Sequence, residues 1–302
     1  MVDVQTVLCP VDFSDATERQ ILFAVDICRH FGARLVVHHN LGGVGPGASV
    51  GWMWADTHPG QSSEKTAEER LRRVLAEIPP DVASEARITH GPPTSSVLNV
   101  ARHVKADLLV LTTHGESHDD HMSVTEQLLE SSDCAVLALH EAGVDRATPR
   151  FSSPGPTPQS IVVPTSFSTT SAAAVDFSFE LARRLSLTLH LLHIEPAKTT
   201  IEEPASALAD EDRRRLLGLV PPELKERAQI HVATGDPAQQ IAASAEQLGA
   251  SLIVMGEHAR TTLRRWFTRD TGRFVLHHAH CPVWYVPSGA TVRSSRAEAR
   301  PG

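Results

Sequence analysis

The sequence predicts an α/β protein built from two tandem doubly wound domains, each with a five-stranded parallel sheet. Three observations support this fold class. The chain has 302 residues, which suits two domains of about 150 residues each. Its two halves repeat each other in sequence. Within each half, short apolar runs alternate with longer amphipathic segments, which is typical of a parallel sheet covered by helices on both faces.

The internal repeat consists of four segments that occur in the same order in both halves. The matching segments are 6–14 with 160–168, 90–93 with 234–237, 106–110 with 250–254, and 134–136 with 281–283. The offset between equivalent positions is 154 for the first pair, 144 for the next two and 147 for the last. These changes indicate a ten-residue insertion and then a three-residue deletion in the first half, relative to the second.

The apolar pattern predicts the same order of elements in both halves. In the first half we expect strands at about 6–11, 34–39, 85–89, 107–112 and 134–139, with helices at about 16–30, 61–77, 94–105 and 122–131. In the second half we expect strands near 160–164, 187–193, 228–232, 251–256 and 282–286. Ligands of doubly wound folds bind at the carboxyl ends of the strands, where the strand order reverses. We therefore expect a ligand site at that edge in each half.

Proline and polar segments predict the domain boundaries. We assign a first domain to residues 1–145, a second domain to residues 160–288 and a polar tail to residues 289–302. Between the domains, residues 146–159 contain Pro149, Pro154, Pro156 and Pro158. Such a density of proline predicts an extended, semi-rigid linker.

Composition and charge exclude several classes of protein. A formal net charge of −8 argues against nucleic acid as the main partner, because neutralising phosphates requires a basic surface. The chain has no run of apolar residues long enough to span a membrane, and its first residues do not read as a secretory signal. Its 4 cysteines contain no C-x-x-C pair and make no disulfide framework. We therefore expect a cytoplasmic protein that binds neither nucleic acid nor membrane.

Three segments of the chain resemble the universal stress protein family. Residues 7–14 resemble the opening strand of the family's domain, residues 256–261 its loop after the fourth strand, and residues 277–283 its closing helix-to-strand turn. The resemblance covers nearly the whole chain, twice. It implies a tandem member with two Rossmann-like domains of the adenine nucleotide alpha hydrolase type.

The resemblance also implies how the two domains pack. In this family two domains meet through their last strands, which are residues 134–139 and 282–286 here. The tandem chain is therefore expected to form an intramolecular pseudo-dimer, with Cys134 and Cys281 as core residues at the starts of these strands. Whether two tandem chains assemble into a further homodimer stays open.

The nucleotide-binding branch of the family carries the motif G-x2-G-x9-G-[ST] after the fourth strand, and an Asp at the end of the first. Glycines allow backbone N–H groups to turn toward phosphate oxygens, and the helix N-terminus that follows favours negative charge. The resemblance assigns adenine-nucleotide (ATP) binding in the first half to Pro10, Val11, Asp12, Gly115, Ser123 and Val124. This half departs from the motif at Thr112, which replaces the first glycine, and at Met122.

The motif loop of the first half is acidic. It contains Glu116, Asp119 and Asp120, whose charges repel phosphates unless a cation intervenes. We therefore interpret the first half as a poor site for a triphosphate alone.

The second half keeps a different part of the motif. Gly256 is retained and is followed by the candidate ligand residues His258 and Arg260, but Ser166 replaces the Asp and Ala259 replaces the second glycine. Four arginines lie in or beside this loop, namely Arg260, Arg264, Arg265 and Arg269. They form either an anion-binding surface, or a solvated face, or ion pairs with acids of the first half. Neither half keeps the full motif, and a hybrid site that uses both subsets stays open.

The acidic loop also suggests a metal hypothesis. His114, His118 and His121 are spaced so that on a helix they would share one face, and imidazole with carboxylate suits zinc. The alternative is a polar surface loop in a chain that contains 17 histidines. No family spacing of metal ligands is present, so the sequence favours the polar loop and we assign no metal residue.

These features together favour a binding or regulatory protein of the stress response over an enzyme. No motif nominates a nucleophile or a metalloprotease pair, so no catalytic residue is assigned. Two alternatives remain: a slow ATPase or metal-dependent enzyme, and an interaction scaffold whose two nucleotide sites are both vestigial.

Overall fold

A computed structural model describes residues 4–42, 64–113, 123–140, 160–195, 205–256 and 269–287. We refer to the described residues up to 140 as the first half, and to those from 160 onward as the second half. The expected linker lies outside the described residues, as does the expected polar tail.

The first half alternates strands and helices in the expected order. Its elements are β1 (Thr6–Pro10), α1 (Ala16–Phe31), β2 (Arg34–Asn40), α2 (Glu64–Glu77), β3 (Ser84–Thr89), α3 (Pro93–Val104), β4 (Leu108–Thr113), α4 (Val124–Ser131) and β5 (Ala135–His140). Local sequence explains the helix ends: Gly32 ends α1 with a φ of 70°, which glycine adopts without strain. Pro93 starts α3, where its missing N–H leaves no hydrogen bond unmade.

The second half repeats this order. Its elements are β6 (Ser160–Pro164), α5 (Thr169–Leu185), β7 (Thr188–Glu195), α6 (Ala205–Leu219), the 3-10 helix η2 (Pro222–Arg227), β8 (Ala228–Thr234), α7 (Pro237–Gln247), β9 (Leu252–Gly256), α8 (Arg269–His278) and β10 (Val283–Val286). Each expected strand is present in both halves, and its ends lie within two residues of those expected. The fold class is thereby confirmed.

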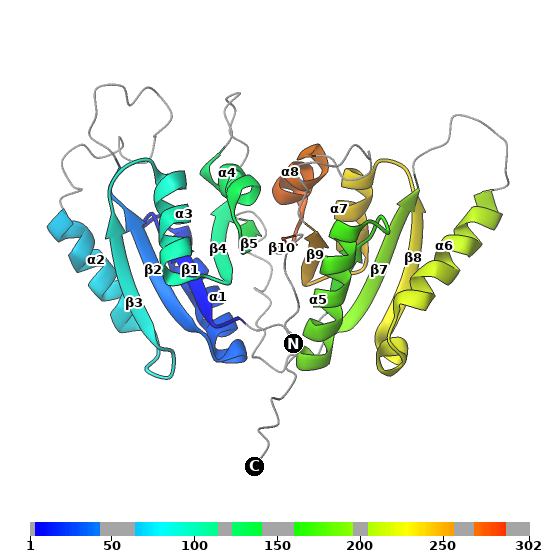
Figure 1. Cartoon of the computed structure of the whole chain (residues 1–302), viewed down its shortest axis with the longest axis horizontal. Coiled ribbons are helices and arrows are strands. Elements are labelled where there is room, and N and C mark those ends of the chain that lie inside the picture. The colour runs from blue at the N-terminus through cyan, green and yellow to red at the C-terminus, as the bar shows by residue number, and fades with distance from the viewer. Residues whose placement is uncertain are drawn as a thin grey trace, which may run out of the picture.

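All ten strands form one sheet, with the order β3-β2-β1-β4-β5-β10-β9-β6-β7-β8 (Figure 1). Pairs within each half are parallel, whereas β5 and β10 pair antiparallel at the centre. The strand order reverses between β1 and β4 in the first half, and between β6 and β9 in the second half. These are the two switch points where a doubly wound fold places ligands.

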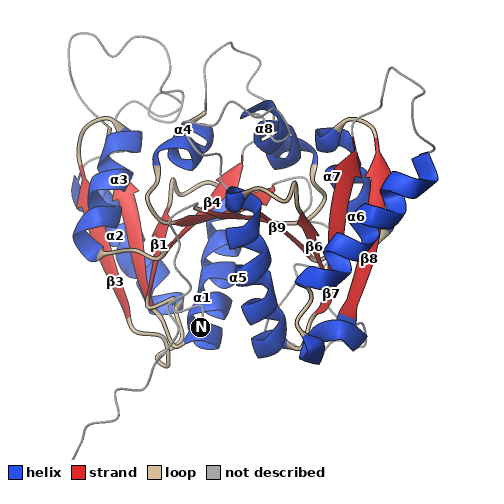
Figure 2. Ribbon diagram, turned by 45° about the vertical axis from the view of Figure 1, so that its right-hand side comes forward, coloured by secondary structure: helices blue, strands red, loops and turns tan. Residues whose placement is uncertain are grey.

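Helices cover both faces of the sheet and form two layers (Figure 2). One layer contains α1, α2, α5 and α6, which pack on a hydrophobic cluster that crosses from one half to the other. The opposite layer contains α3, α4, α7 and α8, which pack on a second cluster. Alternate residues of each strand enter alternate clusters, as the period of two in a strand requires.

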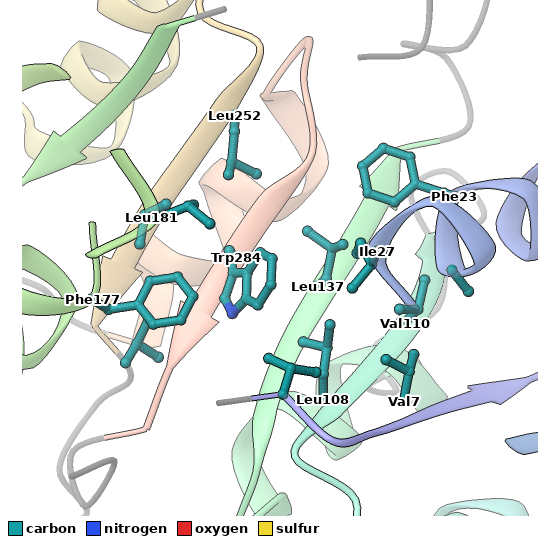
Figure 3. Close-up of a cluster of buried hydrophobic side chains, with 14 of the residues drawn as sticks. Val7, Phe23, Ile27, Leu108, Val110, Leu137, Phe177, Leu181, Leu252 and Trp284 are labelled. Atoms are coloured by element: carbon teal, nitrogen blue, oxygen red, sulfur yellow. The ribbon is translucent and has the colours of Figure 1, made fainter. Parts of the chain in front are cut away.

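The centre of the molecule lies where β5 meets β10. Leu137 is paired with Trp284, which is 0% exposed. The indole packs against Phe177 of α5, with ring centroids 4.9 Å apart, and against Phe31 of α1 at 6.4 Å. Figure 3 shows Trp284 and Phe177 on one side of this cluster and Leu137 with Ile27 on the other. One apolar cluster therefore joins the halves.

The structure corrects one expectation about the cysteines. Cys281 is buried, but Cys134 is only partly buried and lies 3.3 Å from the hydroxyl of Ser132. Cys134 lies between α4 and β5, where its N–H donates to the Ser132 hydroxyl at 3.2 Å, and the surrounding elements do not enclose it as they enclose Cys281. Burial raises the pKa of Cys281 to about 12 and that of Cys134 to about 11, so both remain neutral thiols at pH 7. Among the described helices, none combines the length and apolarity needed to cross a bilayer.

Candidate functional site

The candidate site of the first half lies at the end of β1. Asp12 follows this strand, and its Oδ1 atom accepts three hydrogen bonds: from the Ser14 N–H at 2.9 Å, the Ser14 hydroxyl at 2.7 Å and the Thr17 hydroxyl at 3.1 Å. Phe13 between them has a φ of 61°. This left-handed residue turns the chain sharply, so the carboxylate is tied to the start of α1.

Phe13 stands at the centre of a stack of three side chains. The His39 ring lies 4.3 Å from the Phe13 ring by centroid, and the guanidinium of Arg70 lies 5.4 Å from it. His39 Nδ1 donates to the carbonyl of Val11 at 2.8 Å. Burial lowers the pKa of His39, and the positive charge of Arg70 acts in the same direction. A neutral imidazole and a guanidinium therefore border the Asp12 turn.

The second half contains the same stack. Phe167 has a φ of 56°, the His193 ring lies 4.6 Å from it, and the Arg215 guanidinium lies 3.9 Å from it. His193 Nδ1 donates to the Thr165 carbonyl at 2.8 Å. Asp212 adds an acid here, because its carboxylate lies 3.3 Å from Arg215.

Sequence analysis missed these stacks. The signal was available, since the Phe and His residues of the two stacks lie at the repeat offset of 154. The arginines come from α2 and α6, and only the fold brings them to the strand ends.

Gln20 holds the first switch point together. Its side chain is 2% exposed, and Nε2 donates to the carbonyls of Pro10 and Val110, each at 2.8 Å. These two carbonyls lie on β1 and β4, where the strands separate. The Gln20 amide thus supplies hydrogen bonds to two carbonyl groups that lie beyond the last residue pair of β1 with β4. The equivalent residue of the second half is the buried Ala174, so this bridge belongs to the first half.

Hydroxyl groups replace the Asp12 carboxylate in the second half. Ser166 lies at the equivalent position and donates to Ser168 at 2.9 Å. Ser168 in turn caps α5 by accepting from the Ser171 N–H at 3.3 Å. Thr165 donates to the Ser171 hydroxyl at 3.1 Å. The turn is held by a network of neutral groups, without a carboxylate at the position of Asp12.

Gly256 has a packing role in the second half. It ends β9, and a Cβ atom built there would lie 2.3 Å from the carbonyl oxygen of Thr170 in α5. The strand end and the first turn of α5 are therefore in direct backbone contact. The equivalent position of the first half is Thr112, which carries a side chain. The first half therefore accommodates a side chain at a position where the second half does not.

The Asp12 and Gly256 subsets lie at different switch points. In the sheet, β4, β5 and β10 separate β1 from β9. Four strand spacings amount to roughly 19 Å. The ends of β1 and β9 therefore do not combine into the hybrid site that the sequence left open.

Ser123 and Val124 lie at the start of α4. Ser123 forms a capping box with Glu126: its hydroxyl accepts from the Glu126 N–H at 3.2 Å, and its own N–H donates to the Glu126 carboxylate at 2.6 Å. Val124 packs against the second hydrophobic cluster. These contacts fix the N-terminus of α4 at the carboxyl edge of the sheet.

Glu126 also joins the two halves. It is 4% exposed, and its Oε1 atom lies 2.5 Å from Arg273 Nε and 2.9 Å from His277 Nε2, both on α8. Burial alone would raise the pKa of Glu126. The hydrogen bonds from His277 and Ser123, together with the Arg273 charge, outweigh it and hold the pKa below its usual value.

Several sequence-predicted residues lie outside the described part of the chain. They are Gly115, His258 and Arg260 from the nucleotide hypothesis, and His114, His118 and His121 from the metal hypothesis. Among the described residues, no group of three or more His, Cys, Asp or Glu side chains could hold a metal ion.

A sequence profile of the Universal stress protein family matches residues 3–140 and 158–287. The chain belongs to this family. It carries the universal stress protein domain twice, once in each half.

Individual relatives agree with this assignment. The universal stress protein MJ0531 of Methanocaldococcus jannaschii is 29% identical over 136 residues, which are 42% of this chain and 80% of the relative. A universal stress protein of Archaeoglobus fulgidus superposes with a TM-score of 0.64 at 16% identity, over 93% of this chain and 96% of that one. A functionally unknown protein of Pseudomonas aeruginosa PAO1 gives 0.61 at 14% identity, over 94% and 92%. At such identities the two solved structures support the fold alone.

The contact at Gly256 predicts the effect of adding one methyl group. We expect Gly256→Ala to lower the free energy of unfolding by about 1–3 kcal/mol, because the Cβ atom forces β9 and α5 apart. Urea denaturation followed by circular dichroism measures this change. Gly272→Ala is the matched control: its Cβ would lie 3.8 Å from the Tyr285 ring, an ordinary contact. Equal stability of Gly256→Ala and wild type would contradict the close approach.

Buried His38 predicts a loss of stability in acid. Its side chain is 1% exposed, and burial, aided by His39, lowers its pKa to about 4. The unfolded chain therefore takes up this proton near pH 6.5, while the folded chain resists protonation until about pH 4. The contribution of neutral His38 to the free energy of unfolding is therefore fully present above about pH 6.5, and it is lost as the pH falls toward 4.

A variant pair isolates this contribution. We expect His38→Gln to show a shallower fall of the urea midpoint between pH 7 and pH 4.5 than wild type. Exposed His103, changed to Gln, should leave the fall unchanged. The same slope in His38→Gln and in wild type would show that another group is responsible.

Proposed function

We propose that this universal stress protein is a cytoplasmic regulatory protein of the stress response that binds an adenine nucleotide in its first half. The second half is proposed to have diverged into a degenerate site. The observation that carries the proposal is the oriented carboxylate of Asp12 at the first switch point, next to His39 and Arg70.

The chemistry of Asp12 suits the nucleoside part of the ligand. A carboxylate accepts hydrogen bonds from ribose hydroxyls, and such charge-assisted bonds are stronger than neutral ones. The three bonds from Ser14 and Thr17 orient the group before a ligand arrives, so little side-chain entropy is lost on binding. Pro10 and Val11 supply the backbone of the same turn, with their carbonyls already occupied by Gln20 and His39.

Two differences favour the first half over the second. Ser166 offers a neutral hydroxyl in place of the carboxylate and is engaged with Ser168. Gly256 and Thr170 are in direct backbone contact in the second half, where the first half carries Thr112. The carboxylate acceptor therefore belongs to the first half, and the close approach of strand and helix belongs to the second.

The acidic loop of the first half bears on the form of the nucleotide. Glu116, Asp119 and Asp120 belong to this loop, and their charges oppose bare phosphates. We propose that a divalent cation accompanies the nucleotide and offsets this repulsion. Binding should accordingly be stronger with Mg²⁺ than without it.

The cytoplasmic assignment rests on the cysteines. All four are free thiols, and three of them are buried. Such a chain does not depend on an oxidising compartment for its stability.

Calorimetric titration of the nucleotide-stripped protein with ATP tests the proposal. We expect binding in the micromolar range with Mg²⁺, and an increase of roughly tenfold or more in the Kd for Asp12→Asn, because one charge-assisted acceptor is lost. Asparagine keeps an oxygen that can accept from Ser14, so the turn itself should survive. Ser166→Ala is the matched control in the second half and should leave the Kd unchanged.

Two outcomes would contradict the proposal. No heat and no thermal shift at millimolar ATP would remove nucleotide binding and leave the scaffold alternative. Binding that is lost in Ser166→Ala but kept in Asp12→Asn would assign the site to the second half.

A further inference from the structure

Equivalent residues of the two repeats face each other across the centre of the sheet. At the repeat offset of 147, Leu137 is equivalent to Trp284, and these two residues are paired between β5 and β10. The two neighbouring pairs are equivalent to each other: Val136 pairs with Tyr285, and Val283, the equivalent of Val136, pairs with Ala138, the equivalent of Tyr285. A local pseudo-twofold axis therefore passes through the Leu137–Trp284 pair. Any difference between the repeats at this axis is a difference between the two sides of one interface.

The two sides differ in volume in a complementary way. The large Trp284 lies opposite the smaller Leu137. One layer away the repeats differ again, because Phe31 of α1 packs against the indole while its equivalent in the second half is Leu185. The pairing of a large with a small side chain is therefore a property of the Leu137–Trp284 pair on the axis.

The two sides also differ in charge. Glu126 is equivalent to Arg273, and Glu130 is equivalent to His277. The carboxylate of Glu126 bonds both Arg273 and His277 across the interface. In addition, His140 of β5 donates to the carbonyl of His277 at 2.7 Å. An acidic α4 therefore faces a basic segment of α8; Figure 1 shows the two helices side by side.

Pairing of like with like would lose both kinds of complementarity. Two copies of the first half would bring Glu126 toward a second Glu126 and a second Glu130, at a place where a carboxylate is buried. Two copies of the second half would oppose two Arg273 side chains and two Trp284 rings. A buried charge without a partner and an overfilled core are both strongly unfavourable.

We propose that this interface is heterotypic. The half with an acidic α4 and Leu137 on its last strand pairs only with a domain of the other type, which has a basic α8 and Trp on its last strand. The preferred partner of the β5 and α4 surface is a universal stress protein domain with a basic α8 and a large aromatic residue on its last strand. Within this chain the second half supplies that partner, and the mismatch in charge and volume acts against self-pairing of either half. The inference concerns the described interface and is independent of nucleotide binding.

A charge-reversal cycle in the full-length chain tests the proposal. The variants are Glu126→Arg, Arg273→Glu and the double variant, compared with wild type by urea denaturation. We expect each single reversal to lower the folded-to-unfolded ratio about tenfold or more, because like charges then meet at a buried site. The double variant restores opposite charges, so its ratio should exceed the product of the single effects by about tenfold. The Ser123–Glu126 capping box is lost in Glu126→Arg and in the double variant alike, so this loss cancels from the interaction free energy of the cycle.

The matched control is a second ion pair of the same half. Arg102 and Asp133 lie 3.6 Å apart, but both are exposed. Arg102→Glu should change the ratio by less than about threefold, because exposed pairs contribute little. Additive effects of the two central reversals, with no recovery in the double variant, would overturn the proposal.

A volume-exchange cycle tests the apolar half of the same claim. Trp284→Leu leaves two small residues on the axis, and Leu137→Trp places two large ones there. We expect both single variants to be less stable than wild type, and Leu137→Trp/Trp284→Leu to be more stable than the sum of the single effects predicts. A double variant that is as unstable as this sum would contradict complementarity of volume.

Discussion

The structure depends on the antiparallel pairing of β5 with β10. Without it, the last strand of each half would be an open edge whose backbone groups lack partners and whose inner face is apolar. With it, the ten strands of the described residues form one sheet whose edges are β3 and β8. Trp284 occupies the centre of this junction, completely buried between α1 and α5, so the same contact that closes the sheet also joins the hydrophobic cores of the two halves.

The same junction sets the relation between the two candidate sites. Helices α4 and α8 follow the motif loops of the two halves, and Glu126 binds Arg273 and His277 between them. The two repeats differ at equivalent positions in both places. At the interface Glu126 and Leu137 are equivalent to Arg273 and Trp284, and at the switch points Asp12 and Thr112 are equivalent to Ser166 and Gly256. A single chain thus carries a carboxylate at one switch point, and hydroxyl groups with a close backbone contact at the other.

Most of the fold could be predicted from sequence, because apolar periodicity and the internal repeat both report directly on strands and helices. The site was only partly predictable. Asp12 was proposed because the resembled family keeps an Asp at the end of the first strand. Arg70 and Arg215 were missed because helices far along the chain bring them to the stacks. Gly256 was interpreted through its motif, but its contact with Thr170 depends on the position of α5, which no local pattern encodes. Cys134 was expected in the core because it lies at the start of a strand that joins the halves, but it is only partly buried.

Differential scanning calorimetry tests most directly whether the central junction makes the two halves one unit. Two independent domains would unfold separately, as multidomain proteins commonly do. If the β5–β10 pairing and the Trp284 cluster couple the halves, the chain will show a single transition in which the calorimetric and van't Hoff enthalpies agree. Two resolved transitions, or a van't Hoff enthalpy of about half the calorimetric enthalpy, would contradict the account. Either result would show that each half is stable without the other.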